Sequence, residues 1–160
     1  MVRSRQRDWF CRPAKLVKFI LTLTACLVTL VDRKSGLLIG GKSPKKASAQ
    51  VSKVMIRALR HQPLHTVTPD RGKESAAHAA VTEALGVEFY FASPHHPWER
   101  GTNENTNGLL REYFPKGRPF DKIKVAEVKR VYDKLNKRPR KRLGYRTPYE
   151  VHYGKPLHLI

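Results

Sequence analysis

Between residues 26 and 92 the chain alternates short apolar runs, rich in β-branched residues, with stretches whose apolar residues recur at helical spacing. Two apolar runs come first, at residues 26–32 and 37–39, and the Arg33-Lys34-Ser35-Gly36 segment between them predicts a β-hairpin. Apolar residues at 51, 54, 55, 58 and 59 then predict a helix, followed by a strand at 65–68, a helix at 75–85 and a strand at 87–92. This order predicts an α/β fold with a mixed sheet, part of it parallel.

The C-terminal third is expected to be helical. A turn-rich loop at residues 93–101 leads into a helix at 102–114, and a second helix is expected at 124–136. A dense basic run follows at residues 137–142. Thr147, Pro148 and Glu150 then have the spacing of a capping box with proline at the first helical position, so a short terminal helix is expected there.

The charge of the chain indicates a polyanionic partner. Its 160 residues contain 32 Lys+Arg against 13 Asp+Glu, a formal net charge of +19. Because 40% of the residues are hydrophobic, the chain is expected to fold rather than to remain a disordered polycation. A DNA-binding protein and a basic protein that coats structural RNA fit this composition equally well, since phosphate contacts need only distributed Lys and Arg.

The N-terminal region contains an apolar run at residues 19–31, preceded by Arg3, Arg5 and Arg7, which superficially resembles a signal peptide. The run is shorter than the ~20 residues needed to span a bilayer, so no membrane association is expected. Cys11 and Cys26 have no metal-ligand spacing, and a reducing compartment is the default interpretation.

Two carboxylates stand apart from the surface helices. Asp70 directly follows a predicted strand, Glu104 lies one turn into a predicted helix, and 104 − 70 − 1 = 33 residues separate them. Brought together, such carboxylates could bind Mg²⁺, which prefers oxygen ligands, and a pair of ions can assist an in-line phosphoryl transfer. The structural alternatives are that Asp70 is a turn residue and that Glu104 complements the helix N-terminus.

Four segments resemble the insertion-sequence-thirty family of transposases. The most specific is residues 93–117, SPHHPWERGTNENTNGLLREYFPKG, which resembles the family's third-acid signature. Residues 30–35 (LVDRKS) and 68–74 (TPDRGKE) resemble its hairpin and second-acid segments, and residues 135–148 (LNKRPRKRLGYRTP) resemble its tail. The resemblance covers residues 25–153.

The resemblance implies an α/β, RNase H-like, retroviral-integrase-like core with three acids in the order Asp, Asp, Glu. Asp70 and Glu104 take the second and third places, as catalytic residues and as ligands of Mg²⁺ or Mn²⁺. In such enzymes a metal-activated water cuts the transposon end, and the freed 3′-hydroxyl attacks target DNA. The implied partners are DNA and, in an oligomer, further copies of the chain or an intact transposase. The implied location is the bacterial cytoplasm, at the nucleoid.

The chain departs from the family where the first acid should lie. The family pattern is Asp-Trp-Glu-Gly-Asp; Asp8 and Trp9 begin it here, but Phe10 and Cys11 follow and Arg12 takes the place of the acid. Residues 10–24 match no family segment, so the first strand is expected to be degenerate or missing. We therefore divide the chain into a degenerate leader (1–24), the integrase-type core (25–120) and a C-terminal helix with a basic tail (121–160).

Two further departures affect the expected activity. Asp32 is the one acid between Asp8 and Asp70, and it is a less favoured substitute for the first acid because its own motif places it at the end of a hairpin strand. The helical DNA-binding region that precedes the core in the family has no counterpart here, so weak recognition of transposon ends is expected.

Basic and amide side chains near the two acids are expected to contact DNA. Phosphate binding is assigned to Arg and Lys, and hydrogen bonding to DNA or orientation of Glu104 to the two Asn. The predicted DNA-binding residues are Arg71, Lys73, Arg100, Asn103, Asn107, Arg111, Lys116, Arg138, Arg140 and Arg142. Trp98 is expected to pack beneath its loop, and His95 and His96 lack a third ligand for zinc.

The sequence thus predicts the core of a transposase that acts by metal-dependent phosphoryl transfer, in a copy impaired by loss of the first acid. The alternatives are a non-catalytic DNA-binding remnant and an RNA-binding structural protein. The missing first acid favours the remnant over an active enzyme, whereas the Asp70 and Glu104 motifs have no explanation in an RNA-coating protein.

Overall fold

The computed structural model describes residues 14–21, 25–45, 47–63, 66–69, 78–89 and 101–157. Residues 14–21, 69 and 101–104 are described by their backbone alone. The part of the chain described contains no helix long and apolar enough to cross a membrane.

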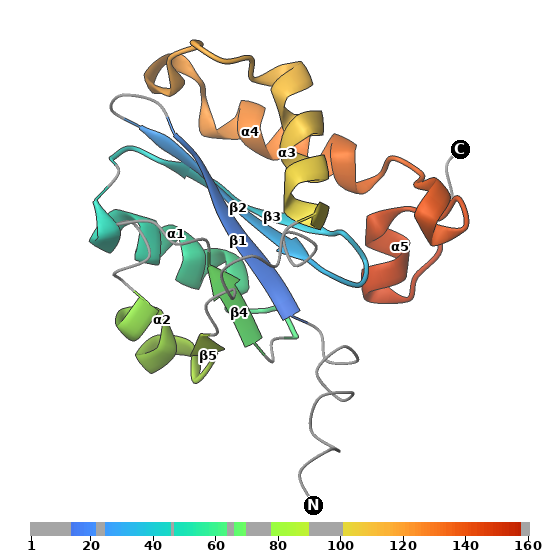
Figure 1. The fold of residues 1–160 in the computed structure, drawn as a ribbon, viewed down its shortest axis with the longest axis horizontal. Coiled ribbons are helices and arrows are strands. Elements are labelled where there is room, and N and C mark those ends of the chain that lie inside the picture. Colours follow the sequence, from blue (N-terminus) through green and yellow to red (C-terminus); the bar gives the residue numbers. More distant parts are fainter. Residues whose placement is uncertain are drawn as a thin grey trace, which may run out of the picture.

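A five-stranded mixed sheet forms the centre of the molecule, in the order β3-β2-β1-β4-β5 (Figure 1). The first three strands pair antiparallel, whereas β4 pairs parallel with β1 and β5 parallel with β4. The strands are β1 (Ala14–Leu21), β2 (Cys26–Asp32), β3 (Leu38–Ser43), β4 (Thr66–Pro69) and β5 (Glu88–Phe89). The expected α/β fold with a mixed sheet is confirmed.

The central strand of the sheet is β1, which sequence reasoning did not place. A first strand of divergent sequence is present, in agreement with the expectation that it is degenerate or missing; it pairs with β2 from Lys15 to Leu21 and with β4 from Ala14 to Val17. The apolar run at residues 19–31 ends one strand and begins the next, so it is divided between two members of one sheet.

Two helical layers cover the sheet, as Figure 1 shows. The helices α1 (Ser48–Leu59) and α2 (His78–Leu85) lie on one face, and α3 (Gly101–Tyr113) and α4 (Val125–Asn136) lie on the other. Short turns of 3-10 helix at Phe120–Lys122 and Lys141–Leu143 precede α4 and the terminal helix α5 (Pro148–Tyr153). The order and type of these helices agree with the sequence-based predictions.

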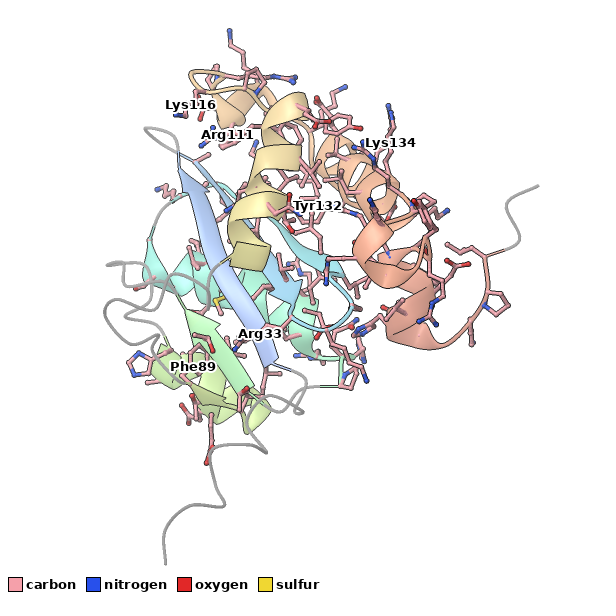
Figure 2. All side chains as sticks on the ribbon, turned by 45° about the vertical axis from the view of Figure 1, so that its right-hand side comes forward. Arg33, Phe89, Arg111, Lys116, Tyr132 and Lys134 are labelled. Carbon is pink, nitrogen blue, oxygen red and sulfur yellow. The ribbon has the colours of Figure 1, made fainter. Side chains whose placement is uncertain are left out.

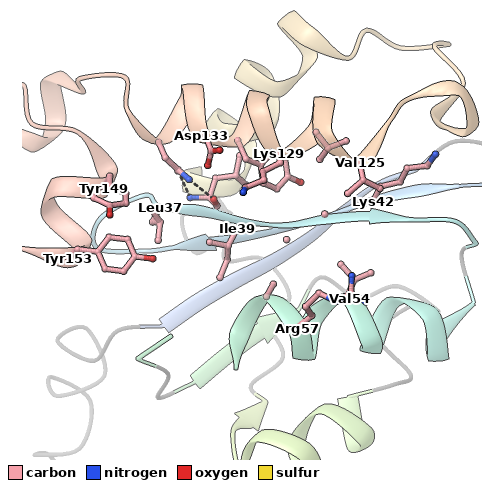
Figure 3. Close-up of a pocket in the computed structure, with 17 residues that line it drawn as sticks. Leu37, Ile39, Lys42, Val54, Arg57, Val125, Lys129, Asp133, Tyr149 and Tyr153 are labelled. Atoms are coloured by element: carbon pink, nitrogen blue, oxygen red, sulfur yellow. Dashed lines mark hydrogen bonds between the residues drawn. The ribbon is translucent and has the colours of Figure 1, made fainter. Parts of the chain in front are cut away.

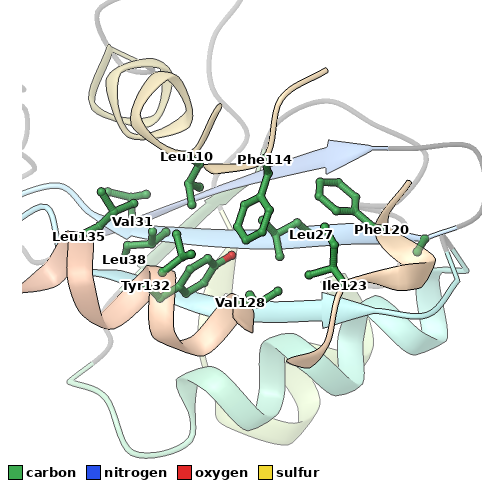
Figure 4. Packing of buried hydrophobic residues seen from close by; sticks show 12 residues of the cluster. Leu27, Val31, Leu38, Leu110, Phe114, Phe120, Ile123, Val128, Tyr132 and Leu135 are labelled. Carbon is green, nitrogen blue, oxygen red and sulfur yellow. The ribbon is translucent and has the colours of Figure 1, made fainter. Parts of the chain in front are cut away.

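The alternation of side chains along β2 divides the core into two clusters. Leu27 and Val31 point to the face covered by α3 and α4, whereas Val28 and Leu30 point to the face covered by α1 and α2. The cluster on the first face, drawn in Figure 4, is completed by Ala25, Leu38, Leu110, Phe114, Phe120, Ile123, Val128, Val131, Tyr132 and Leu135. A strand buried on both faces needs an almost uninterrupted apolar sequence, and every residue of β2 is buried.

The second hairpin strand runs further than expected. We expected the apolar run to end before Gly40 and Gly41, but β3 continues through both to Ser43. Gly40 has φ +130°, and a Cβ added to it would lie 2.1 Å from the carbonyl oxygen of Val28. Glycine is therefore required for the close approach of β3 to β2 at this point.

Polar side chains of α4 tie the helix to the sheet. Asn136 accepts a hydrogen bond from the Leu38 amide at 2.8 Å and donates one to the Leu38 carbonyl at 2.7 Å. The hydroxyl of Tyr132 donates to the Val28 carbonyl at 3.0 Å, and burial raises the pKa of this hydroxyl above its ordinary value. Since α4 shares one core cluster with β2 and α3, residues on both sides of position 120 pack together; the division of the chain into three parts stays a prediction.

Candidate functional site

The elements that carry the two predicted catalytic acids adjoin the same strand. Asp70 directly follows β4, whose last residue, Pro69, pairs with Val17 of β1. Glu104 lies in the first turn of α3, and α3 contacts both β1 and β2 (Figure 1). Asp70 and the side chain of Glu104 lie outside the described residues, so their approach to each other stays a prediction.

The central strand supplies no carboxylate to this region. The sequence of β1 is AKLVKFIL, which contains Lys15 and Lys18 but no Asp or Glu. Lys18 follows directly after Val17, the residue paired with Pro69. Arg12, which takes the first acid's place in the family pattern, lies before the strand and outside the described residues.

Asp32 takes part in the hairpin turn through one of its carboxylate oxygens. It ends β2 and is 3% exposed. Its Oδ2 accepts hydrogen bonds from the Ser35 amide at 2.8 Å and from the Ser35 hydroxyl, and lies 3.7 Å from Nδ1 of His152 in α5. The other ring nitrogen of His152 lies 3.0 Å from Oε1 of Gln62, at the end of α1. Asp32 thus stabilises the hairpin turn, and His152 contacts this turn from α5.

One side of α3 carries the predicted DNA-contacting residues beyond Glu104. Asn107 and Arg111 follow Glu104 by three and seven residues, which places them on one face of the helix. The side-chain oxygen of Asn107 is buried and has no hydrogen-bond partner among the described residues. In Figure 2, Arg111 and Lys116 lie near the C-terminal end of α3, and Lys116 is exposed.

The three predicted DNA-binding arginines after α4 lie in one loop. Arg138 reaches Glu112 of α3 at 3.8 Å, in an exposed pair, so the loop adjoins the helix that carries Arg111. Arg140 is half-buried, and its Nη2 donates to the Leu135 carbonyl at 3.4 Å. Burial lowers the pKa of Arg140, and the nearby charges of Arg138 and Arg142 lower it further. The structure therefore brings together three like charges that the sequence placed only in a run.

Several predicted site residues fall outside what the structure describes. These are Asp70, Arg71, Lys73 and Arg100, together with the side chains of Asn103 and Glu104 and the loop residues His95, His96 and Trp98. Within the described ranges, no group of three His, Cys, Asp or Glu side chains is arranged to hold a metal ion.

A pocket of about 420 Å³ along the edge strand was missed by sequence reasoning. It lies against β3, between α1 and α4, and Figure 3 shows Ile39, Val54, Val125, Tyr149 and Tyr153 around it, with Lys42, Arg57 and Lys129 among the charged residues. The signal that could have revealed the pocket is the Gly40-Gly41 pair, since two residues without side chains leave an edge strand open.

Solved structures of low sequence identity share the fold. The catalytic core domain of BIV integrase superimposes with a TM-score of 0.69 at 20% identity, covering 88% of this chain and 93% of that one. A chain of the simian T-cell lymphotropic virus intasome, solved in complex with PP2A regulatory subunit B56 gamma, gives 0.69 at 18% identity, covering 92% of this chain and 56% of that one. The fold is therefore that of an integrase-type, RNase H-like catalytic core.

Sequence relatives narrow this class to a family, although no family model matches the chain. The transposase for insertion sequence element IS4351 of Bacteroides fragilis is 45% identical over 126 residues, which are 78% of this chain and 39% of that protein. The transposase InsI for IS30A of Escherichia coli (strain K12) is 41% identical over 133 residues, 81% of this chain and 35% of that protein. The matched part of the chain belongs to the insertion-sequence-thirty family of transposases, and the chain spans under two fifths of the length of these relatives.

Proposed function

We propose that this chain is the catalytic core of a DNA transposase in which binding to DNA is retained and strand transfer is lost. The observation that carries the proposal is the loss of the family's first acid from the sequence. Arg12 stands at its place in the family pattern, and β1, which follows it between the hairpin and β4, contains two lysines and no carboxylate.

The donor set fits one hard divalent cation and not a pair. Asp70 and Glu104 provide carboxylate oxygens, the ligands that Mg²⁺ or Mn²⁺ prefers. A third carboxylate is needed to bridge two ions, and the family pattern has Arg12 in its place here. A cation at this position would repel a metal ion, so we derive no reaction step through the metal. Loss of one metal from a two-metal site removes several kcal/mol of barrier lowering, which corresponds to several powers of ten in rate.

Binding to DNA is supported by the distribution of charge. The net charge of +19 is spread through the chain, and the structure groups Arg138, Arg140 and Arg142 in a loop that adjoins α3. The second candidate function is that of a non-catalytic remnant, which binds DNA or assembles with an intact transposase. The family membership and the missing first acid support it. Location at the bacterial nucleoid, in the cytoplasm, is part of this proposal.

A strand-transfer assay tests the proposal. Precut transposon ends are used, in Mg²⁺ and in Mn²⁺, so that weak end recognition is not mistaken for loss of chemistry. We expect no joining by this chain, and we expect joining once residues 8–24 are replaced by the corresponding segment of an intact family member. The replacement should fail when Glu104→Gln is added. Joining by the unaltered chain that disappears with Glu104→Gln would contradict the proposal.

A further inference from the structure

The loop after α4 concentrates positive charge without local compensation. Residues 137–146, called here the basic loop, contain six Lys or Arg, and no Asp or Glu occurs between residues 134 and 149. Glu150, the first acid after the loop, already accepts hydrogen bonds from the Thr147 and Leu157 amides. The pair between Arg138 and Glu112 is exposed and contributes little.

Backbone hydrogen bonds fix the shape of the basic loop. The Arg140 amide donates to the Arg146 carbonyl at 3.0 Å, and the Tyr145 amide donates to the Arg140 carbonyl at 3.0 Å. The chain reverses through Gly144 and Tyr145, which have φ of 64° and 62°. Non-glycine residues rarely adopt such values, so the surrounding contacts hold Tyr145 in place. The backbone of the loop therefore has a defined shape before any partner binds.

The basic loop packs against the turn between β2 and β3. A Cβ added at Gly36 would lie 2.2 Å from Nη2 of Arg142, which places the guanidinium of Arg142 directly over the turn. The turn itself carries Arg33 and Lys34, and Figure 2 shows Arg33 on this part of the molecule. The loop and the turn together form one positively charged surface.

One aromatic side chain of the basic loop is exposed for contact with a partner. Tyr145 is 71% exposed, between Arg142 and Arg146 in the sequence. An exposed aromatic ring among cations is the arrangement that single-stranded nucleic acid recognises, because the backbone meets the charges while a base stacks on the ring.

We propose that the basic loop and the β2–β3 turn form a preformed binding surface for the DNA backbone, with Tyr145 as the platform for an unpaired base. The inference rests on the proposed function and names the form of DNA that this surface takes. A duplex offers its phosphates to the arginines but keeps its bases stacked, so only an unpaired strand uses the whole surface.

Fluorescence anisotropy over a salt series tests the charged part of the surface, with one labelled duplex and one labelled single strand. The slope of log K against log salt reports the phosphate contacts, at roughly 0.9 per contact for duplex and 0.7 for single strands. The double variant Arg138→Gln/Arg142→Gln should reduce this slope by roughly 1.8 for the duplex and by roughly 1.4 for the single strand. The control Lys53→Gln/Lys129→Gln, which removes the same charge from exposed positions of α1 and α4, should leave it unchanged.

The aromatic part is tested with Tyr145→Ala and Tyr145→Phe, which place equal demands on the left-handed backbone. Tyr145→Ala should weaken binding of the single strand about tenfold and spare the duplex, while Tyr145→Phe should retain both affinities. Equal slopes for the two double variants, or equal losses on duplex and single strand for Tyr145→Ala, would overturn the inference. Absence of DNA binding by the unaltered chain would instead reject the proposed function.

Discussion

Asn136 and Leu38 exchange two hydrogen bonds, so a side-chain amide of α4 takes the position that a neighbouring strand would occupy at the edge of the sheet. Leu38 belongs to β3, which has a strand partner on one side only. An edge strand exposes unpaired amides and carbonyls that can pair with other chains, and Asn136 blocks one such residue. The helix is thereby fixed to the sheet by a polar contact inside an otherwise apolar interface.

Asn136→Ala should lower the free energy of unfolding by about 2–4 kcal/mol, because both backbone groups of Leu38 would be left buried without partners. Urea denaturation measures the change. Lys137→Ala, at the next and exposed position, serves as the control and should change the stability by less than about 0.5 kcal/mol. Equal stability of the two variants would show that water replaces the amide at this edge.

Gly40→Ala should destabilise the protein by at least about 2 kcal/mol. The new Cβ would lie 2.1 Å from the Val28 carbonyl oxygen, on a residue with φ +130°. Gly41→Ala is a matched control, since the nearest atom to its Cβ would be Cγ1 of Val54 at 3.8 Å, an ordinary contact. Thermal unfolding of the two variants compares them directly, and a similar melting temperature would count against the close approach of β3 to β2.

Asp32→Asn should leave the affinity for the metal ion unchanged, whereas Asp70→Asn should weaken it at least about tenfold. Substitution of residues that only orient a metal ligand already lowers metal affinity by about tenfold or more, so loss of a ligand should cost at least as much. The reason is that the Asp32 carboxylate is engaged by Ser35 and lies buried in the hairpin turn. Electron paramagnetic resonance of free Mn²⁺ titrated with each variant gives the affinities. Weakened binding in Asp32→Asn, at a temperature where the variant is folded, would reinstate Asp32 as a ligand.

Glu150 should make the stability depend on pH in the acidic range. Hydrogen bonds from the Thr147 amide, then from the Leu157 amide and the Thr147 side chain, lower the pKa of Glu150 below its ordinary value of 4.5. A carboxyl whose folded pKa is lowered contributes stability above its unfolded pKa, and the contribution is lost as the pH falls through the folded pKa. Glu150→Gln should therefore flatten the decline of stability below about pH 4.5, measured by urea denaturation at several pH values; an unchanged decline would assign it to other acids.

The sequence was sufficient for the elements whose pattern is local. The hairpin from residue 26, the four longer helices and the capping box at Thr147 and Glu150 follow from periodicity and end signals, and the structure confirms them. Gly86, directly after α2, has a left-handed φ of 63°, the conformation for which glycine is favoured at the end of a helix. Such features depend on neighbours within a few residues, so one chain is enough to read them.

The features that were missed depend on residues far apart in the sequence. Eight residues with two lysines do not identify β1; its place is set by β2 on one side and β4 on the other. Asn136 and Leu38 are 98 positions apart, and no spacing links them. The contact of Arg142 with Gly36 is of the same kind, which is why the basic run was predicted but its partner in the hairpin turn was not.

The position of β1 has a consequence for how such a chain can change over time. The strand is held by main-chain hydrogen bonds to two neighbours, and every residue except proline can make these bonds with little regard to its side chain. Architecture and chemistry are therefore under separate constraints at the middle of the sheet. A catalytic acid can be lost at this strand while the strand keeps its place in the sheet, so the fold can persist after the catalytic activity is lost.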